Sequence, residues 1–130
     1  MKILETVLYA EDLHAAHHFY VELLGLEAIS FNPERSLFLR LTGSVLILFR
    51  ATKTIIPDAG VPPHGCTGQG HMAFAAGPGD IESWKQRLQA ANIEILQEIT
   101  WENGARSLYF PDPSGNLLEF AEPKLWDIEG

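Results

Sequence analysis

Arg-Ser-Leu-Phe-Leu at residues 35–39 returns as Arg-Ser-Leu-Tyr-Phe at residues 106–110. A glycine and a strand pattern follow each copy, Ser-Val-Leu-Ile-Leu-Phe at 44–49 and Asn-Leu-Leu-Glu-Phe at 116–120. Solenoids stack several short units, so a repeat this long is not typical of them. The duplication therefore predicts two copies of one structural unit in a pseudo-twofold arrangement.

Each copy reads as one strand, one helix and three further strands. Residues 5–10 lie over 71–76, and their alternation predicts the first strand of each copy. Helices are predicted over 12–24 and 80–92, capped by Asp12 and Asp80, because a carboxylate can accept from the first free N–H groups. The strands are predicted at 2–10, 26–32, 36–42, 44–51, 69–76, 93–100, 107–111 and 116–121.

The length of 130 residues indicates one domain. The order of the predicted strands and helices makes it an α+β domain of two tandem βαβββ units. Prolines and glycines concentrate between the copies, which is typical of a linker that can carry function as a lid or binding loop. The predicted boundaries are a first unit at 1–51, a linker at 52–69, a second unit at 70–122 and a C-terminal tail at 123–130.

Charge and composition exclude several classes of function. The net charge of −8 and the pI near 5.0 argue against nucleic-acid and anionic-membrane binding, which need a basic surface. A single cysteine, Cys66, rules out an internal disulfide. With no signal-peptide pattern and no apolar run of membrane-spanning length, the sequence predicts a cytoplasmic protein.

Three side chains at repeat-related strand positions form the candidate metal site. Glu119 lies between Leu118 and Phe120 in a strand that reads as buried, and Glu5 has apolar neighbours on its own face. A buried carboxylate must be paired, protonated or metal-bound. His71 is the repeat partner of Glu5, and one imidazole with two carboxylates suits a divalent cation such as Mn, Fe, Zn, Ni or Mg. The alternative is that Glu5 and Glu119 lie on solvent-facing sides of their strands and that His71 makes an ordinary hydrogen bond.

Four further residues are candidates for substrate contacts or catalysis. His64, in the proline-rich linker, could close over a pocket as a proton donor or lie exposed. Arg106 could clamp a substrate anion or pair with a nearby acid. Tyr109 and Trp101 could line an apolar substrate wall or belong to the core. Glu119 is the candidate catalytic carboxylate as well as a metal ligand.

Several stretches together resemble the vicinal oxygen chelate superfamily of glyoxalases, extradiol dioxygenases, fosfomycin-resistance thiol transferases and bleomycin-resistance proteins. They are Glu5–Tyr9 before Asp12-Leu13, Phe19-Tyr20 with Leu24-Gly25-Leu26, Gly70–Phe74, and Tyr109–Asn116 leading into Leu118-Glu119-Phe120. The resemblance implies a mixed-sheet, half-barrel glyoxalase-like fold with metal ligands at positions 5, 47, 71 and 119. Here Ile47 cannot coordinate, and Glu5 stands where three-ligand members usually have histidine.

Two functions remain open at this point. The first is a metal-dependent enzyme, a dioxygenase, lyase or thiol transferase, in which the cation acts as a Lewis acid on a small oxygen-rich substrate. The second is a metal-free drug-binding protein of the bleomycin-resistance kind. The resemblance also implies a homodimer whose sites are shared between the first unit of one chain and the second unit of its partner; the sequence leaves open whether sites form within one chain instead.

Overall fold

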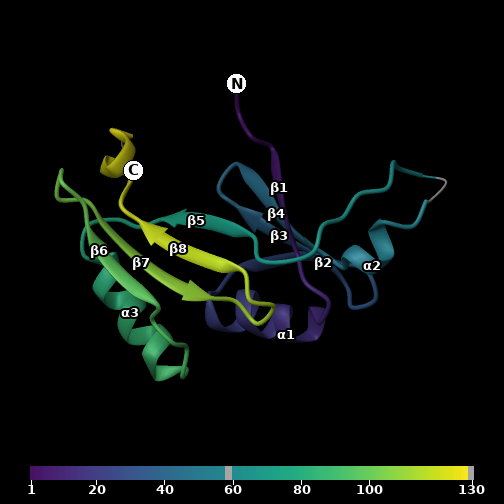
Figure 1. The fold of residues 1–130 in the computed structure, drawn as a ribbon, viewed down its shortest axis with the longest axis horizontal. Helices are drawn as coiled ribbons and strands as arrows, with labels where there is room; N and C mark the ends of the chain where they lie inside the picture. Colours follow the sequence, from purple (N-terminus) through teal and green to yellow (C-terminus); the bar gives the residue numbers. More distant parts are fainter. Residues whose placement is uncertain (58–59, 129–130) are drawn as a thin grey trace. The chain divides into compact units, whose positions relative to one another are not determined.

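A computed structural model describes residues 1–57 and 60–128, which group into two units. Unit 1 comprises residues 1–70 with the turn at 113–115, and unit 2 comprises the remainder. Each unit contains a four-stranded mixed sheet with helical segments (Figure 1). The predicted α+β class, with one βαβββ pattern in each half of the chain, is confirmed.

Unit 1 pairs its first strand with its last. The sheet order is β1-β4-β3-β2, with β1 parallel to β4 and the other pairs antiparallel. Its elements are β1 (Glu5–Tyr9), α1 (Leu13–His17), η1 (His18–Leu23), β2 (Glu27–Asn32), β3 (Ser36–Leu41), β4 (Ser44–Phe49) and α2 (Ala51–Thr54).

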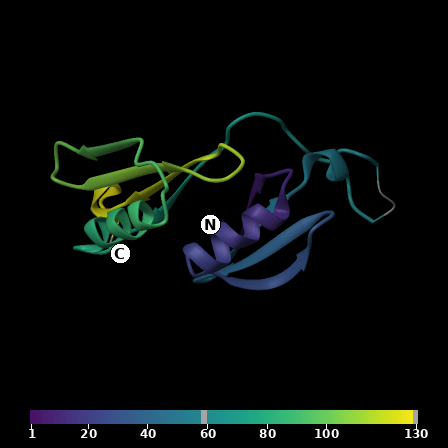
Figure 2. The same ribbon diagram turned by 90° about the horizontal axis from the view of Figure 1, so that it is seen from below.

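The helical layer of unit 1 starts as predicted and then changes its winding. Asp12 caps α1, accepting from the N–H of Ala15 at 3.0 Å. The single helix predicted to Leu24 instead passes into the π-helix η1. Helix propensity does not distinguish these windings, so the sequence could not reveal the change. Figure 2 shows these segments, in purple, lying along the unit 1 sheet.

Unit 2 repeats the topology with the order β5-β8-β7-β6. Its elements are β5 (His71–Ala75), α3 (Asp80–Ala90), β6 (Gln97–Thr100), β7 (Arg106–Pro111), β8 (Leu117–Ala121) and the 3-10 helix η2 (Pro123–Trp126). The Trp84 ring of α3 stacks on Phe120 of β8 at 4.4 Å, so α3 covers the sheet face that carries Phe120. The prediction that Asp80 caps this helix was wrong. Gly79 is the N-cap, and Asp80 accepts instead from the N–H of Gly77 at 2.9 Å.

The pairing of the first and last strands shows which positions of the two units are structurally equivalent. In unit 1, Val7 pairs with Ile47, and in unit 2, Ala73 pairs with Glu119. Counting from these pairs, Ile47 and Glu119 are equivalent, as the repeat predicts. Glu5 and His71 are likewise equivalent, because each opens the first strand of its unit. Successive side chains alternate between sheet faces, so residue parity decides which of these positions can meet.

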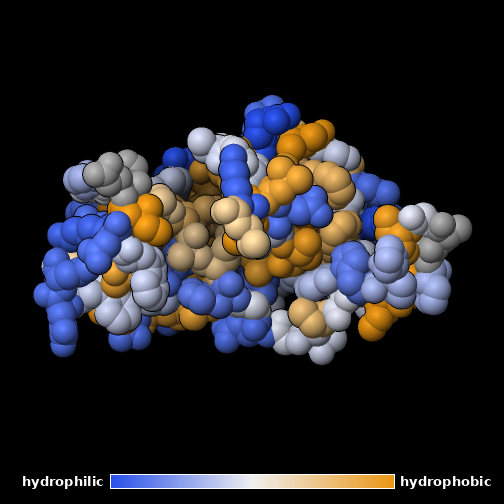
Figure 3. Space-filling model, turned by 90° about the horizontal axis from the view of Figure 1, so that it is seen from above, coloured by the Kyte–Doolittle hydropathy of each residue, from blue (hydrophilic) through white to orange (hydrophobic). Residues whose placement is uncertain are grey.

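Large apolar side chains are buried in both units, but several others are exposed. The fully buried ones include Leu37, Leu39, Leu46 and Leu48 in unit 1 and Leu88, Leu108, Phe110 and Leu118 in unit 2. The exposed ones lie mostly in the terminal segments and the loop after α2, and Figure 3 shows apolar surface in orange among hydrophilic residues. They include Ile3, Leu4, Ile55, Ile56, Val61, Trp126 and Ile128. Among residues 1–57 and 60–128, no helix is long and apolar enough to cross a bilayer.

Candidate functional site

His71 and Glu119 meet on the face of the unit 2 sheet that α3 leaves uncovered. Glu119 has the opposite parity to Phe120, so its side chain points away from α3. The Nε2 atom of His71 lies 3.3 Å from Oε1 of Glu119. The Glu119 side chain is only 7% exposed, whereas that of His71 is 51% exposed. A buried carboxylate therefore has a half-open imidazole beside it.

The backbone decides which nitrogen of His71 carries the proton. Nδ1 lies 2.9 Å from the carbonyl oxygen of Leu117, which can only accept a hydrogen bond. Nδ1 must then be protonated, which leaves the lone pair of a neutral imidazole on Nε2. Two acceptors, Nε2 of His71 and Oε1 of Glu119, consequently face each other at 3.3 Å. This arrangement is favourable only when a cation or a proton lies between them.

Tyr109 completes the surroundings of Glu119. It pairs with Glu119 across β7 and β8, and its ring stacks near His71 with 6.3 Å between centroids. Burial raises the pKa of Tyr109, and the negative charge of Glu119 with a hydrogen bond to it adds to the rise. The phenol therefore stays protonated at neutral pH. Two of the predicted site residues and one predicted wall residue thus lie together.

Trp101 also approaches this face of the sheet. Its indole N–H donates to Oγ of Ser107 at 2.9 Å. Ser107 is two residues from Tyr109 in β7, so the two side chains share a face. Trp101 is half-buried there. A place in the wall of a substrate site stays a prediction for it.

Arg106 lies on the other face, so the structure does not bring it to Glu119. Its separation of three residues from Tyr109 gives it the opposite parity along β7. The guanidinium pairs with Glu98 of β6 and Glu82 of α3. Hydrogen bonding to Glu98 is the main cause that raises the pKa of Arg106. This is the pairing with nearby acids that the sequence offered as the alternative to a substrate clamp.

Glu5 belongs to unit 1 and is exposed at the start of β1. The repeat position that carries Glu119 in unit 2 holds Ile47 here, which is 3% exposed. Phe38 pairs with Ile47 where Tyr109 pairs with Glu119. Over residues 1–57 and 60–128, no three His, Cys, Asp or Glu side chains gather closely enough to hold a metal. Joining Glu5 to His71 and Glu119 remains a prediction.

His64 is held against β1 by a long-range hydrogen bond. Its Nδ1 lies 2.6 Å from the hydroxyl of Tyr9, 55 residues away in sequence. The imidazole also meets the Phe49 ring edge-on at 4.9 Å. Burial raises the pKa of Tyr9, and Cys66 adds to the rise. Sequence reasoning missed Tyr9: alternation placed it on the face of Glu5, but no local signal pointed to a loop contact so distant.

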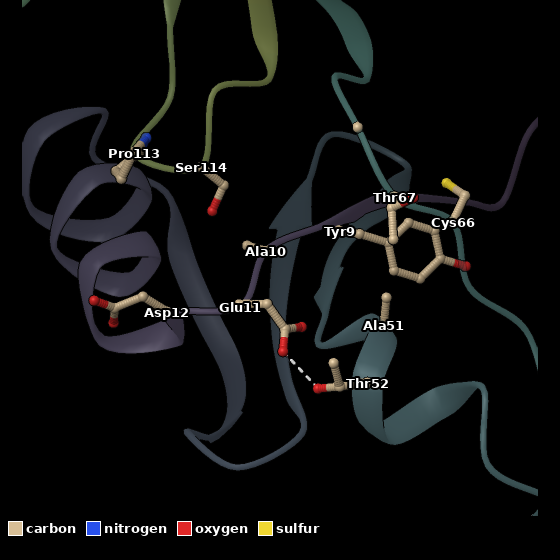
Figure 4. A pocket seen from close by; sticks show the side chains of 11 residues that line it. Tyr9, Ala10, Glu11, Asp12, Ala51, Thr52, Cys66, Thr67, Pro113 and Ser114 are labelled. Atoms are coloured by element: carbon tan, nitrogen blue, oxygen red, sulfur yellow. Dashed lines mark hydrogen bonds between the residues drawn. The ribbon is translucent and has the colours of Figure 1, made fainter.

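A cavity of about 400 Å³ opens beside Tyr9 in unit 1 (Figure 4). Two of its lining residues are joined by a hydrogen bond, in which the hydroxyl of Thr52 donates to the carboxylate of Glu11. The remaining lining is contributed by Tyr9, Ala10, Asp12, Ala51, Cys66, Thr67, Gly68, Pro113 and Ser114. Within unit 1 this cavity therefore brings two carboxylates, Glu11 and Asp12, and the hydroxyl of Thr52 together with Tyr9 of β1.

Comparison with known proteins agrees with the observed fold. A lactoylglutathione lyase from Agrobacterium tumefaciens has 39% identity and a TM-score of 0.95, and the match covers 98% of each chain. A glyoxalase/bleomycin resistance protein/dioxygenase from Nocardioides has 28% identity and a TM-score of 0.73, over 94% of this chain and 83% of that one. The metallothiol transferase FosB of Staphylococcus saprophyticus is 36% identical over 58 residues, covering 44% of this chain and only 38% of the transferase.

The family model described as the Glyoxalase/Bleomycin resistance protein/Dioxygenase superfamily matches residues 2–120. That match includes both βαβββ patterns and positions 5, 71 and 119. The resemblance inferred from the repeat and the observed strand order therefore lead to the same assignment: the chain belongs to the glyoxalase/bleomycin resistance protein/dioxygenase superfamily.

Proposed function

We propose that this chain is a metal-dependent enzyme that acts on a small substrate through neighbouring oxygen atoms, most simply as a lyase. The observation that carries the proposal is the pair of facing acceptors, Nε2 of His71 and Oε1 of Glu119, 3.3 Å apart. Burial of Glu119 makes an uncompensated charge costly there. A divalent cation held by both groups removes that cost.

The donor set fits such a cation. His71 offers a lone pair on Nε2 because the carbonyl of Leu117 holds its other nitrogen, an arrangement usual for metal-binding histidines. Glu5 would supply a second carboxylate, and two carboxylates with one imidazole favour Mn, Fe, Zn, Ni or Mg over soft metals. When bound, the metal would supply Lewis-acid stabilisation of negative charge on substrate oxygens.

Residues of the chain itself would transfer a proton, position the carboxylate and shield the substrate from water. Glu119 is the carboxylate proposed to take a proton from the substrate. Tyr109, kept protonated by its raised pKa, holds Glu119 through their hydrogen bond. Trp101 and Tyr109 would shield the substrate from water on this face. A homodimer in which Glu5 comes from the partner chain, and a cytoplasmic location, complete the proposal.

The lyase reading comes first because the 39% identical structure is a lactoylglutathione lyase. Ile47 argues against a four-ligand glyoxalase site, because its side chain cannot coordinate a metal and leaves that ligand set incomplete. Thiol transfer is supported by the partial match to a metallothiol transferase. An anionic phosphonate would need basic groups, and Arg106 is already paired with two acids. Ring cleavage of a catechol with O₂ is the third reaction to test.

The test begins with untagged protein and its metal content. Chelator-treated protein is then reloaded with each of the five metals and assayed for loss of the methylglyoxal–glutathione adduct, thiol addition to fosfomycin and O₂ uptake with catechols. We expect one activity that Glu119→Gln abolishes, whereas Glu94→Gln, at an exposed residue of unit 2, leaves it unchanged. No metal in the protein, no stabilisation by any metal and no activity would overturn the proposal. Tight stoichiometric binding of a drug without metal would identify a binding protein instead.

A further inference from the structure

We infer that Ser107 is a positioning residue, which orients the proposed metal ligand Glu119 through a chain of hydrogen bonds. The chain begins at the indole of Trp101 and reaches the carboxylate through the phenol of Tyr109. The inference rests on the proposed function, because holding a metal ligand is the task that it assigns to the chain. It also gives Trp101 a role besides lining a substrate wall. All four side chains belong to unit 2.

Strand geometry brings these side chains to one face of the sheet. Ser107 and Tyr109 are two residues apart in β7, so their side chains point to the same side. Tyr109 pairs with Glu119 of β8, which places the carboxylate on that side as well. From the segment that follows β6, the indole N–H of Trp101 reaches Oγ of Ser107 at 2.9 Å. Three segments of the chain thus contribute to one line of polar groups.

The chemistry of the two ends fixes the direction of every bond between them. The indole N–H can only donate, so Ser107 accepts from Trp101. An ionised carboxylate can only accept, so the hydroxyl of Tyr109 gives its single hydrogen to Glu119. The hydrogen between Ser107 and Tyr109 must therefore come from Ser107. The bond to Glu119 raises the pKa of Tyr109 and the bond from Ser107 lowers it, as this order requires.

Burial distinguishes Ser107 from a substrate contact. Ser107 is 0% exposed, so a substrate cannot touch it, and any effect on the site must pass through Tyr109. Glu119 is also buried, and a buried polar group that loses its partner costs free energy. The phenol that donates to Glu119 therefore limits where its carboxylate can turn. One oxygen of that carboxylate, Oε1, lies 3.3 Å from Nε2 of His71.

Unit 1 keeps the serine but lacks the rest of the chain. Ser36 follows an arginine in the repeated motif, as Ser107 does. At the next positions Phe38 replaces the tyrosine and Ile47 replaces the glutamate. A phenylalanine has no hydroxyl that could connect a serine to an acid. Ser36 is therefore a matched control for Ser107 within the same protein.

The first measurement is the affinity for Mn²⁺, obtained from the electron paramagnetic resonance signal of the free ion above chelator-treated protein. Replacing a group that supports a metal ligand costs about 10- to 100-fold in affinity, so Ser107→Ala and Tyr109→Phe should each weaken Mn²⁺ binding at least about tenfold. The double variant should bind no more weakly than Tyr109→Phe alone, because Ser107 acts only through the phenol. Ser107→Thr restores the hydroxyl and should bind more tightly than Ser107→Ala, and Ser36→Ala should match the wild type.

A second measurement follows the chain in metal-free protein. The variant Trp101→Phe identifies the indole N–H resonance of Trp101 in nuclear magnetic resonance spectra, and Ser107→Ala should move this resonance. Each donor in a hydrogen-bonded chain polarises the next, so Tyr109→Phe should move it as well, by a smaller amount. Because phenylalanine keeps the aromatic ring, such a shift reports the lost hydroxyl. Ser36→Ala should leave the resonance in place, and a serine with a merely structural role would transmit no change from Tyr109.

Four results would overturn the inference. They are unchanged Mn²⁺ affinity in Ser107→Ala, additive losses in the double variant, equal affinities of Ser107→Thr and Ser107→Ala, and an indole resonance that ignores Tyr109→Phe. If Ser107→Ala does not fold, Trp101→Phe tests the chain from its other end and should also weaken Mn²⁺ binding. If wild-type protein binds none of the five metals, the proposed function fails. The indole resonance then decides alone: a shift in Tyr109→Phe supports the chain that holds Glu119, and no shift overturns it.

Discussion

Replacing Glu119 by glutamine should remove most of the stabilisation that a bound metal confers. A ligand at one hundred times its Kd stabilises the folded state by about 2.7 kcal/mol. For 130 residues, an unfolding entropy near 2.1 cal/mol/K per residue gives about 0.27 kcal/mol/K in total. The corresponding rise in Tm for the wild type is about 10 °C.

Loss of the carboxylate charge in Glu119→Gln should weaken metal affinity by at least about a hundredfold, because replacing groups that only support metal ligands already costs up to about a hundredfold. At the same metal concentration the stabilisation then falls to at most about 0.4 kcal/mol, or roughly 1.5 °C. Without metal we do not expect Glu119→Gln to lower the Tm. The amide introduced by Glu119→Gln can donate to Nε2 of His71, so the metal-free Tm should stay level or rise.

The assay is differential scanning fluorimetry of chelator-treated protein, with and without each divalent metal. Glu94→Gln changes charge by the same amount at an exposed position of unit 2 and should keep the full rise of the wild type. An equal metal-induced rise in Glu119→Gln and the wild type would refute the assignment of Glu119 as a ligand. A metal-free Tm several degrees lower in Glu119→Gln would refute the acceptor–acceptor argument, because it would show that the carboxylate is already well paired.

Three further predictions concern unit 2. The pKa of Tyr109 is raised, so the stability that its protonated phenol contributes is present below pH 10 and is lost as the pH rises through the folded-state pKa. In Glu119→Gln, ultraviolet titration of the phenol should show this pKa moving down towards the usual value. Asp112→Ala removes the buried acceptor of two bonds from Asn116, both 2.9 Å, and urea unfolding should show a loss of about 1–3 kcal/mol. Arg106→Met breaks only partly exposed ion pairs, so the same measurement should show less than about 1 kcal/mol.

Much of the fold was predictable because its signals are local. Alternating strands and the Asp12 cap depend only on residues that are close in sequence. The duplication is found by comparing the two halves of the chain directly. The passage of α1 into η1 was not predictable, since helix propensity does not distinguish the two windings. The linker predicted at 52–69 overlaps the short helix α2 at Ala51–Thr54, which has only four residues and therefore little periodicity to recognise.

The candidate site was predictable where parity alone decides it. Glu119 and Tyr109 are brought together because they pair across adjacent strands on one face. Arg106 could have been excluded on the same ground, because an odd separation from Tyr109 places it on the other face. The contact between Tyr9 and His64 could not be predicted, because it depends on how an irregular loop folds back over the sheet. Long-range loop contacts leave no periodic trace in sequence.

In both units the strand that comes first in the chain pairs with the strand that comes last. Glu5 pairs with Val45, and His71 pairs with Leu117, so neither parallel ladder can form until the later residue has been synthesised. During synthesis the hairpin of β3 and β4 can assemble locally, whereas β1 stays an unpaired edge until the hairpin emerges. Glu119 lies on the last strand of all. Under the proposed function, a chain that terminates before β8 would lack Glu119, so it could not hold the metal and would have no activity.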